Sequence, residues 1–156
     1  EVMGLDTDLG TAYAKSQMAA GGSLPLEGRV FISVSDAHKA EVADLAKRFA
    51  DLGFKLSSTT GTAAVLAKAG LEVESVPKLA EGRPNTLDLL KNNEIQLVIN
   101  TPSGQAPRAD EIKIRTTAIY TNTPIMTTIG SAKAAADGIA ALKQNGYGVK
   151  SLQEYL

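Results

Sequence analysis

Short β-prone segments alternate with helical segments along most of this chain, and the connections between them are short. In the first pair, Arg29 to Val34 is a strongly β-prone run, and residues 37–52 place Val42, Leu45 and Phe49 on one helical face before Gly53. Such alternation is typical of β/α units on a parallel sheet, because each helix carries the chain back to the start of the next strand. We therefore expect an α/β fold with a central, mainly parallel sheet of about five strands. The expected strands are 29–34, 54–57, 71–76, 95–99 and 125–128, and the expected helices are 37–52, 62–69, 86–92, 110–120 and 132–143.

Two terminal segments lie outside this alternation. Residues 9–20 have helical spacing and stop at Gly21-Gly22, and residues 21–28 have the composition of a linker. A domain boundary is therefore expected near residue 26, and the helix before it is expected to be incompletely buried. At the other end, residues 149–156 are expected to form a last strand or a helical turn.

Charge and composition exclude several function classes. The 156 residues include 16 basic and 17 acidic side chains, so the basic footprint of a protein that binds nucleic acid or an anionic membrane is missing. There is no cysteine, which excludes disulfides and thiolate metal sites. No apolar run reaches the length of a membrane span, and we expect a cytoplasmic domain that binds a small ligand or a protein.

A polar stretch, Ser57 to Thr62, separates the second expected strand from its helix. A strand that enters a Thr/Gly turn and then a helix gathers N–H groups, hydroxyls and the positive helix end around one point, which favours an anion. The stretch is therefore a candidate phosphate cradle. It matches no established phosphate-loop pattern, and the alternative is a plain connection in which Thr59 or Thr60 caps the helix and Gly61 relieves the turn. From this stretch alone, the plain connection is the commoner case.

Other polar residues are expected at the same edge of the sheet. In an open α/β sheet, ligands bind beyond the carboxyl ends of the strands, near the point where the strand order reverses. Lysines in such places are ordinarily solvated surface charges, but their shared placement favours a ligand site. The segments expected at this edge are Ser33 to Lys39, Thr59 to Thr62, Lys78 and Asn100 to Ser103.

Short motifs of one family run through nearly the whole chain. They are Glu1-Val-Met-Gly4, Ser33-Val34 with Lys39, Gly53-Phe54, Thr59-x-Gly61-Thr62-Ala63, Lys78, Glu81-Gly-Arg-Pro84, Leu97-Val-Ile-Asn-Thr101, Asp110, Ile114-Arg115, Thr127-Thr128 and Val149-x-Ser-Leu-Gln153. In this order and at these separations, they resemble the methylglyoxal-synthase-like domain at the C-terminus of the large subunit of carbamoyl phosphate synthetase.

This resemblance implies a Rossmann-like three-layer sandwich and a regulatory role. It assigns residues 1–25 to a helical tail and linker of the preceding ATP-grasp half, and residues 26–156 to the regulatory domain. The implied parent enzyme makes carbamoyl phosphate from bicarbonate, glutamine-derived ammonia and two ATP, for pyrimidine and arginine synthesis. The implied partners are the ATP-grasp domains of the same chain and a glutaminase small subunit. The parent uses ATP and a divalent metal, whereas this domain is expected to hold no cofactor or metal of its own.

The resemblance also implies an effector nucleotide of the UMP or IMP type, and it assigns roles to individual residues. Asp110 belongs to the matching motifs, and Thr127 matches a position used for ornithine in some relatives, so both are secondary candidates. Pro102 and Thr116 depart from the pattern, where relatives often have threonine and arginine. The expected phosphate-binding residues are Lys39, Thr59, Gly61, Thr62 and Lys78, with Ser33 and Asn100 close to the ligand.

The chief alternative is a free-standing methylglyoxal synthase that releases phosphate from dihydroxyacetone phosphate. Relatives with that activity carry a His-Asp-Pro-Asp element after the fourth strand, where this chain has residues 106–110 with Asp110 alone retained. His38 is expected to be a solvated residue at a helix start, and Asn100 replaces a carboxylate of that enzyme. A third alternative, the purine-pathway cyclohydrolase relative, lacks its longer motifs here. We therefore expect no catalytic residue in this domain.

Overall fold

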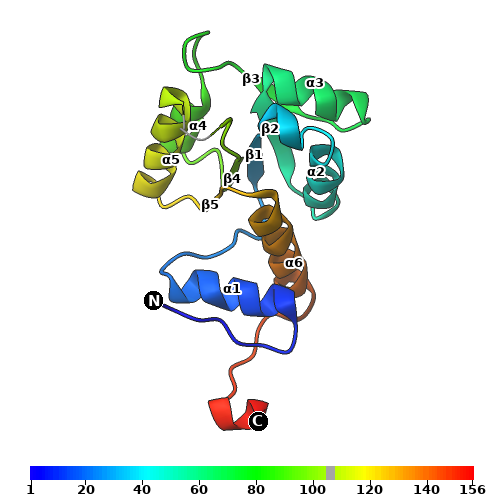
Figure 1. Ribbon diagram of the computed structural model, residues 1–156, viewed down its shortest axis with the longest axis vertical. Coiled ribbons are helices and arrows are strands. Elements are labelled where there is room, and N and C mark those ends of the chain that lie inside the picture. The colour runs from blue at the N-terminus through cyan, green and yellow to red at the C-terminus, as the bar shows by residue number, and fades with distance from the viewer. Residues whose placement is uncertain (105–107) are drawn as a thin grey trace.

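The computed structural model describes residues 1–104 and 108–156, and at its centre lies a five-stranded sheet (Figure 1). All strand pairs are parallel, in the order β3-β2-β1-β4-β5. This confirms the predicted α/β class with a central parallel sheet. The strands are β1 (Arg29–Ser33), β2 (Lys55–Thr59), β3 (Glu74–Val76), β4 (Leu97–Asn100) and β5 (Ile125–Met126). The helices are α1 (Leu9–Ala19), α2 (Val42–Asp51), α3 (Thr60–Lys68), α4 (Thr86–Lys91), α5 (Ala109–Tyr120) and α6 (Ile129–Asn145), with 3₁₀ turns η1 (Asp36–His38) and η2 (Leu152–Tyr155).

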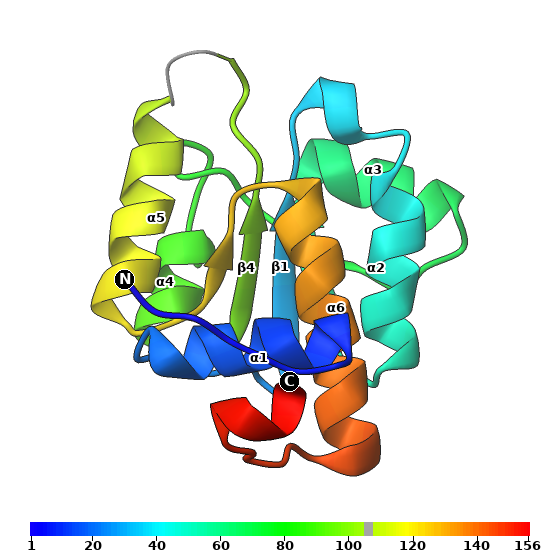
Figure 2. The same cartoon turned by 60° about the horizontal axis from the view of Figure 1, so that its bottom comes forward.

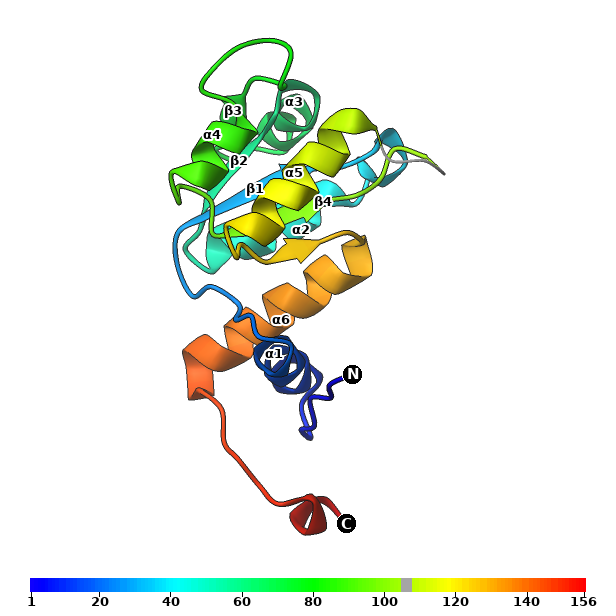
Figure 3. The same cartoon turned by 90° about the vertical axis from the view of Figure 1, so that its left-hand side faces the viewer.

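Two apolar clusters fill the space on the two faces of the sheet. In β1, Val30 and Ile32 belong to the cluster under α2, α3 and α6, whereas Phe31 between them belongs to the cluster under α4 and α5. All three are fully buried, as expected for a parallel strand covered on both faces. Figure 3 shows the resulting three layers, with α1 beyond α6. No helix in the described part of the chain is long and apolar enough to cross a membrane.

The N-terminal helix α1 lies across α6 (Figure 2). Gly10 of α1 and Gly138 of α6 meet at the crossing, and a Cβ placed on Gly10 would lie 2.7 Å from the backbone of Asp137. Ala14 is fully buried in the same cluster as Val30. The expectation of incomplete burial is confirmed, because only Gly10 and Ala14 of α1 are buried, but at this crossing the two backbones approach closely. The assignment of residues 1–25 to a separate unit stays a prediction.

Several element bounds differ from the prediction. The helix expected over residues 37–52 is divided into η1 and α2, because Ser35 does not cap it and instead contacts His38, with Oγ and Nδ1 3.0 Å apart. The last helix begins at Ile129, three residues early, because the hydroxyl of Thr128 caps it by accepting from the Ser131 N–H. The strand expected over 71–76 is only Glu74–Val76, and residues 152–155 form a helical turn.

The close crossing of α1 and α6 predicts how a substitution at Gly10 changes the free energy of unfolding. Gly10→Ala should destabilise the fold by about 1–3 kcal/mol, because the new methyl group meets backbone that cannot rotate away. Chemical denaturation followed by circular dichroism measures this change. Gly130→Ala is the matched control, since Gly130 is also the second residue of a helix and its added Cβ would meet nothing closer than 3.9 Å. Equal stability of the two variants would contradict the close crossing.

Candidate functional site

Strand β2 continues directly into helix α3, so the predicted polar turn over Ser57 to Thr62 is wrong. Ser57 and Ser58 are fully buried inside β2, and the Ser58 hydroxyl donates to the carbonyl of Ile32, 2.5 Å away. The Ser58 hydroxyl is thus satisfied within the sheet, whereas the buried Ser57 hydroxyl has no hydrogen-bond partner among the described residues. Thr59 occupies the N-cap position of α3, but its side chain makes no capping hydrogen bond, so the simple capping role is wrong too. The first N–H groups of α3 therefore remain uncapped by Thr59.

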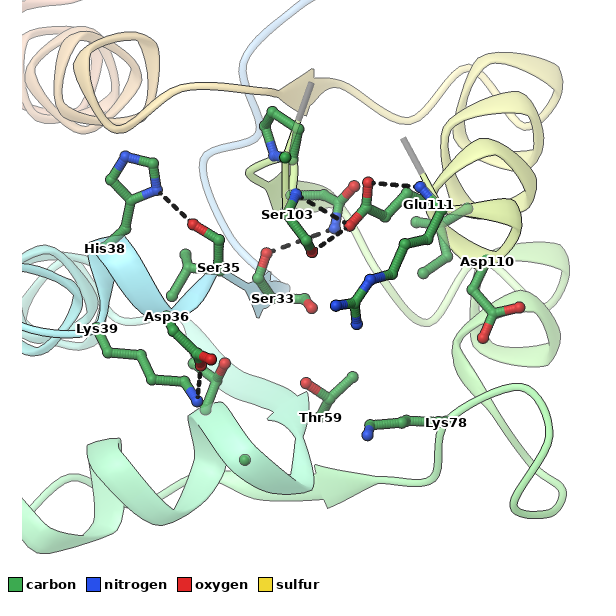
Figure 4. Close-up of a pocket in the computed structure, with 18 of the residues that line it drawn as sticks. Ser33, Ser35, Asp36, His38, Lys39, Thr59, Lys78, Ser103, Asp110 and Glu111 are labelled. Carbon is green, nitrogen blue, oxygen red and sulfur yellow. Dashed lines mark hydrogen bonds and ion pairs between the residues drawn. The ribbon is translucent and has the colours of Figure 1, made fainter. Parts of the chain in front are cut away.

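A cavity of about 580 Å³ lies at the carboxyl ends of β1, β2 and β4, where α3 begins (Figure 4). The strand order reverses between β1 and β4, so the cavity occupies the usual ligand position of an open α/β sheet. Asp110 also lines it, whereas Thr127 lies between β5 and α6 and does not. The cavity wall contains all of the residues predicted to bind the effector, which are Ser33, Lys39, Thr59, Gly61, Thr62, Lys78 and Asn100.

Two lysines flank the start of α3. In Figure 4, Lys39 and Lys78 lie on either side of Thr59. The Lys39 ammonium is 2.5 Å from a carboxylate oxygen of Asp36 and 3.7 Å from the point that a Cβ on Gly61 would occupy. Lys78 lies 3.8 Å from Glu81, and 59 % of its side chain is exposed. This end of the cavity combines two ammonium groups with the positive end of a helix, which suits a phosphate dianion.

The Asp36 carboxylate competes for the same ammonium group. Its hydrogen bond and ion pair with Lys39 lower the pKa of Asp36, and the more distant charge of Arg108 adds to this. A bound anion at Lys39 would have to displace Asp36 or share the ammonium with it.

The floor of the cavity is the end of β4. Asn100 is 2 % exposed, and its amide nitrogen donates to the carbonyl of Ser33 over 3.4 Å. Its side-chain oxygen is buried and has no hydrogen-bond partner within the described residues. A buried acceptor without a partner is costly, so the site favours a ligand that donates a hydrogen bond here.

Several contacts around the cavity were not expected from the sequence. The expectation of a solvated His38 is wrong, because its Nδ1 lies 3.0 Å from the Ser35 hydroxyl and 3.2 Å from that of Thr101, and the residue lines the cavity. On the opposite wall, Glu111 accepts from Ser103 and from the Arg108 N–H. The Arg108 to Glu111 spacing, that of a carboxylate reaching back over a helix start, was the available signal. Of the stretch compared with the methylglyoxal synthase element, residues 106 and 107 lie outside the described residues.

The sequence matches the model of one protein family, the MGS-like domain, over residues 41–127. The chain belongs to the MGS-like domain family. The matched segment includes Thr59, Gly61, Thr62, Lys78 and Asn100, whereas Ser33 and Lys39 precede it.

The curated relatives of this MGS-like domain are much longer proteins. It is 48 % identical to the carbamoyl phosphate synthase large chain of Nostoc sp. over 155 residues, and 51 % identical to that of Acidobacterium capsulatum over 153 residues. These alignments cover 99 % and 98 % of this chain but only 14 % of each relative. The C-terminal section of the large chain from Methanopyrus kandleri is 45 % identical, over 99 % of this chain and 29 % of that protein.

Solved structures support the fold. Methylglyoxal synthase from Elizabethkingia anophelis superposes with a TM-score of 0.60 at 18 % identity, over 72 % of this chain and 79 % of that one. ForH superposes with a TM-score of 0.52 at 21 % identity, over 76 % of this chain and 80 % of that one. With the parallel sheet and its covering helices, these neighbours confirm the predicted Rossmann-like three-layer sandwich.

The loop that carries Lys78 is fixed at its far end by Asp88. The carboxylate of Asp88 accepts from the Arg83 guanidinium and from the Asn85 N–H, and these contacts lower its pKa to about 2. Because this pKa is below the ordinary value of 3.8, the stabilisation is complete above about pH 4 and is lost as the pH falls through about 2.

An NMR pH titration of the Asp88 carboxyl carbon should therefore report a pKa of about 2. Arg83→Ala should raise this pKa toward 3.8, since the Arg83 hydrogen bond is its largest cause. Lys91→Ala is the control, because the charge of Lys91 is the smallest contribution and its loss should change the pKa little. An ordinary pKa in the unaltered protein would show that this ion pair does not form in solution.

Proposed function

We propose that this MGS-like domain binds a nucleoside monophosphate of the UMP or IMP type and regulates a carbamoyl phosphate synthase to which it belongs. Its curated relatives are large chains of that enzyme, and the domain corresponds to about one seventh of their length. The proposed whole enzyme is a cytoplasmic ligase that makes carbamoyl phosphate from bicarbonate, glutamine-derived ammonia and two ATP, for pyrimidine and arginine synthesis. Its ATP-grasp domains and glutaminase small subunit are the proposed partners, and ATP and a divalent metal act there.

One observation carries the proposal. Seven residues from four separate parts of the sequence line a single cavity, and two of them are lysines beside the start of α3. Backbone N–H groups, the Thr62 hydroxyl and two ammonium groups together can balance the two negative charges of a phosphate monoester. The volume of about 580 Å³ leaves room beyond the phosphate for a sugar and a base.

Regulation follows from linkage. A nucleotide that binds more tightly to one arrangement of the domain relative to the rest of the enzyme shifts the equilibrium toward that arrangement and so changes the activity. The coupling free energy between the two sites is typically about 1–3 kcal/mol. The domain itself needs only to bind. Thr127 lies outside this cavity and stays a prediction for a separate ornithine site.

Nucleotide binding is measured by titration calorimetry with UMP and IMP. Lys78→Ala should weaken binding about tenfold or more, because a charge-assisted contact to the phosphate is lost. Lys68→Ala is the matched control, since Lys68 is an exposed lysine in the last turn of the same helix whose first turn lies at the site. Equal affinities of the Lys78 and Lys68 variants would place the phosphate elsewhere.

The hydroxyl of Thr62 offers a second test of the same site. The side chain is buried at the start of α3, so Thr62→Ala should weaken nucleotide binding, while Thr62→Ser should restore most of the affinity because it keeps the hydroxyl. The corresponding nucleosides, without phosphate, should bind poorly to every variant. Tight binding of a nucleoside would contradict the phosphate as the anchor.

We further propose that the domain has no catalytic activity of its own. Asn100 cannot exchange a proton, and a proton-transferring base is needed to convert dihydroxyacetone phosphate to methylglyoxal. His38 and Asp110 do line the cavity, which is why the alternative activity needs a direct assay. Incubation of the pure domain with dihydroxyacetone phosphate should yield methylglyoxal no faster than buffer does. Turnover that disappears on Asp110→Asn or His38→Gln would establish the alternative.

A further inference from the structure

The wall of the cavity opposite Lys39 is held by a single buried carboxylate. Glu111, in the first turn of α5, is 7 % exposed, and both of its oxygens are used. Oε1 accepts from the Ser103 hydroxyl over 2.5 Å and from the Ser103 N–H over 3.2 Å. Oε2 accepts from the Arg108 N–H over 3.1 Å. One side chain thus ties Ser103, three residues past the end of β4, to Arg108, the residue that precedes α5.

These three residues all line the cavity, and Arg108 and Glu111 lie at the start of α5, which covers the face of the sheet opposite α3. In Figure 4, Ser103 and Glu111 lie on one side of the view, whereas Lys39 lies on the other. A phosphate held at the start of α3 fills only one end of a cavity of about 580 Å³. A ligand that fills the cavity from the start of α3 to the α5 side must carry more than a phosphate.

We propose that Glu111 is a positioning residue that holds Arg108 for contact with the nucleoside part of the ligand. This inference rests on the proposed function. The planar guanidinium of Arg108 offers several donors in fixed directions, which suit the carbonyl and hydroxyl acceptors of a base and sugar. Such a contact needs a fixed backbone, because an error of about 1 Å in a binding group loses most of its benefit. Glu111 provides that support without touching the ligand.

The chemistry of a carboxylate explains why glutamine cannot replace it. Glu111 accepts hydrogen bonds on both oxygens, from Ser103 at one and from Arg108 at the other. A glutamine side chain has an acceptor on one side only, and its NH₂ group would face an N–H donor. Glu111→Gln therefore keeps the shape of the side chain but leaves one backbone N–H, that of Ser103 or that of Arg108, without its acceptor.

The test compares two probes, inorganic phosphate and UMP or IMP, by NMR titration of the whole domain. Glu111→Gln should leave the affinity for phosphate within about twofold of the unaltered protein and lower that for the nucleotide about tenfold. Arg108→Ala should give the same selective loss, and the double variant should lose little more, because both changes remove one contact. A structural defect alone would weaken both probes together. Ser103→Ala, which removes the 2.5 Å hydrogen bond but keeps a small side chain, should give a smaller loss in the same direction.

Two matched controls test whether the effect of Glu111→Gln depends on its place in the cavity wall. Glu154 accepts from the N–H and hydroxyl of Ser151 in η2, outside the cavity, so Glu154→Gln alters a similar contact and should change neither affinity. Lys113→Ala removes an exposed charge from α5 and should also have no effect.

The outcomes distinguish this inference from the proposed function. If the unaltered protein binds the nucleotide but Glu111→Gln and Ser103→Ala keep the same ratio of nucleotide to phosphate affinity, the role of Glu111 is wrong and the proposed function stands. If Arg108→Ala weakens phosphate as much as nucleotide, Arg108 binds the phosphate and this inference is overturned. If the unaltered protein binds neither probe, both the inference and the proposed function fail.

Discussion

The pairing of β1 with β4 sets the point in the sheet at which the polar strand ends of this domain meet. The two strands run parallel with Ser33 opposite Asn100, and β2 joins the other side of β1 with Ile32 opposite Ser58. Because all three strands end at the same edge, their following segments converge there, although they are far apart in the sequence. A slip of one residue in either pairing would move side chains such as Phe31 from one apolar cluster to the other and displace the polar strand ends from one another. The hydrophobic pattern of β1 and β4, buried on both faces, therefore specifies the cavity as well as the core.

The parts of this structure that could be predicted from sequence are those that depend on pattern alone. Five apolar runs predict five parallel strands, and strand ends predict which residues meet, so the cavity-lining residues Lys39, Thr62 and Lys78 were found. The polarity of the stretch from Ser57 predicts a turn, and this prediction is wrong because Ser57 and Ser58 lie inside β2. Buried hydroxyls paired to a neighbouring carbonyl, as at Ser58, follow from the strand pairing and cannot be seen in the local sequence.

Contacts between residues on separate elements could not be predicted from the sequence. His38 meets Thr101 across 63 positions, and Gly10 meets α6 across more than 120, so neither follows from local spacing. Glu111 is different, because its contact to Arg108 is local and has the spacing of a helix-start motif. The spacing does not indicate that the same carboxylate also accepts hydrogen bonds from Ser103. The close approach of α1 to α6 is absent from the local sequence for a related reason, since small residues give a weak hydrophobic signal but allow close backbone contact.

The crossing of α1 and α6 has a mechanical consequence. Side chains between two helices act as a soft layer, since they change rotamer and absorb small shifts, but at Gly10 and Gly138 no such layer exists. A displacement of α1 relative to α6 would therefore have to move backbone against backbone, because no side chain lies between Gly10 and Gly138 that could change rotamer instead. Helix α6 in turn packs against the core beneath β1 and β4 through Ala132, Ala135 and Ile139. The N-terminal helix is thus joined to the core beneath the sheet through α6, with a contact between backbones at the crossing instead of a layer of adjustable side chains.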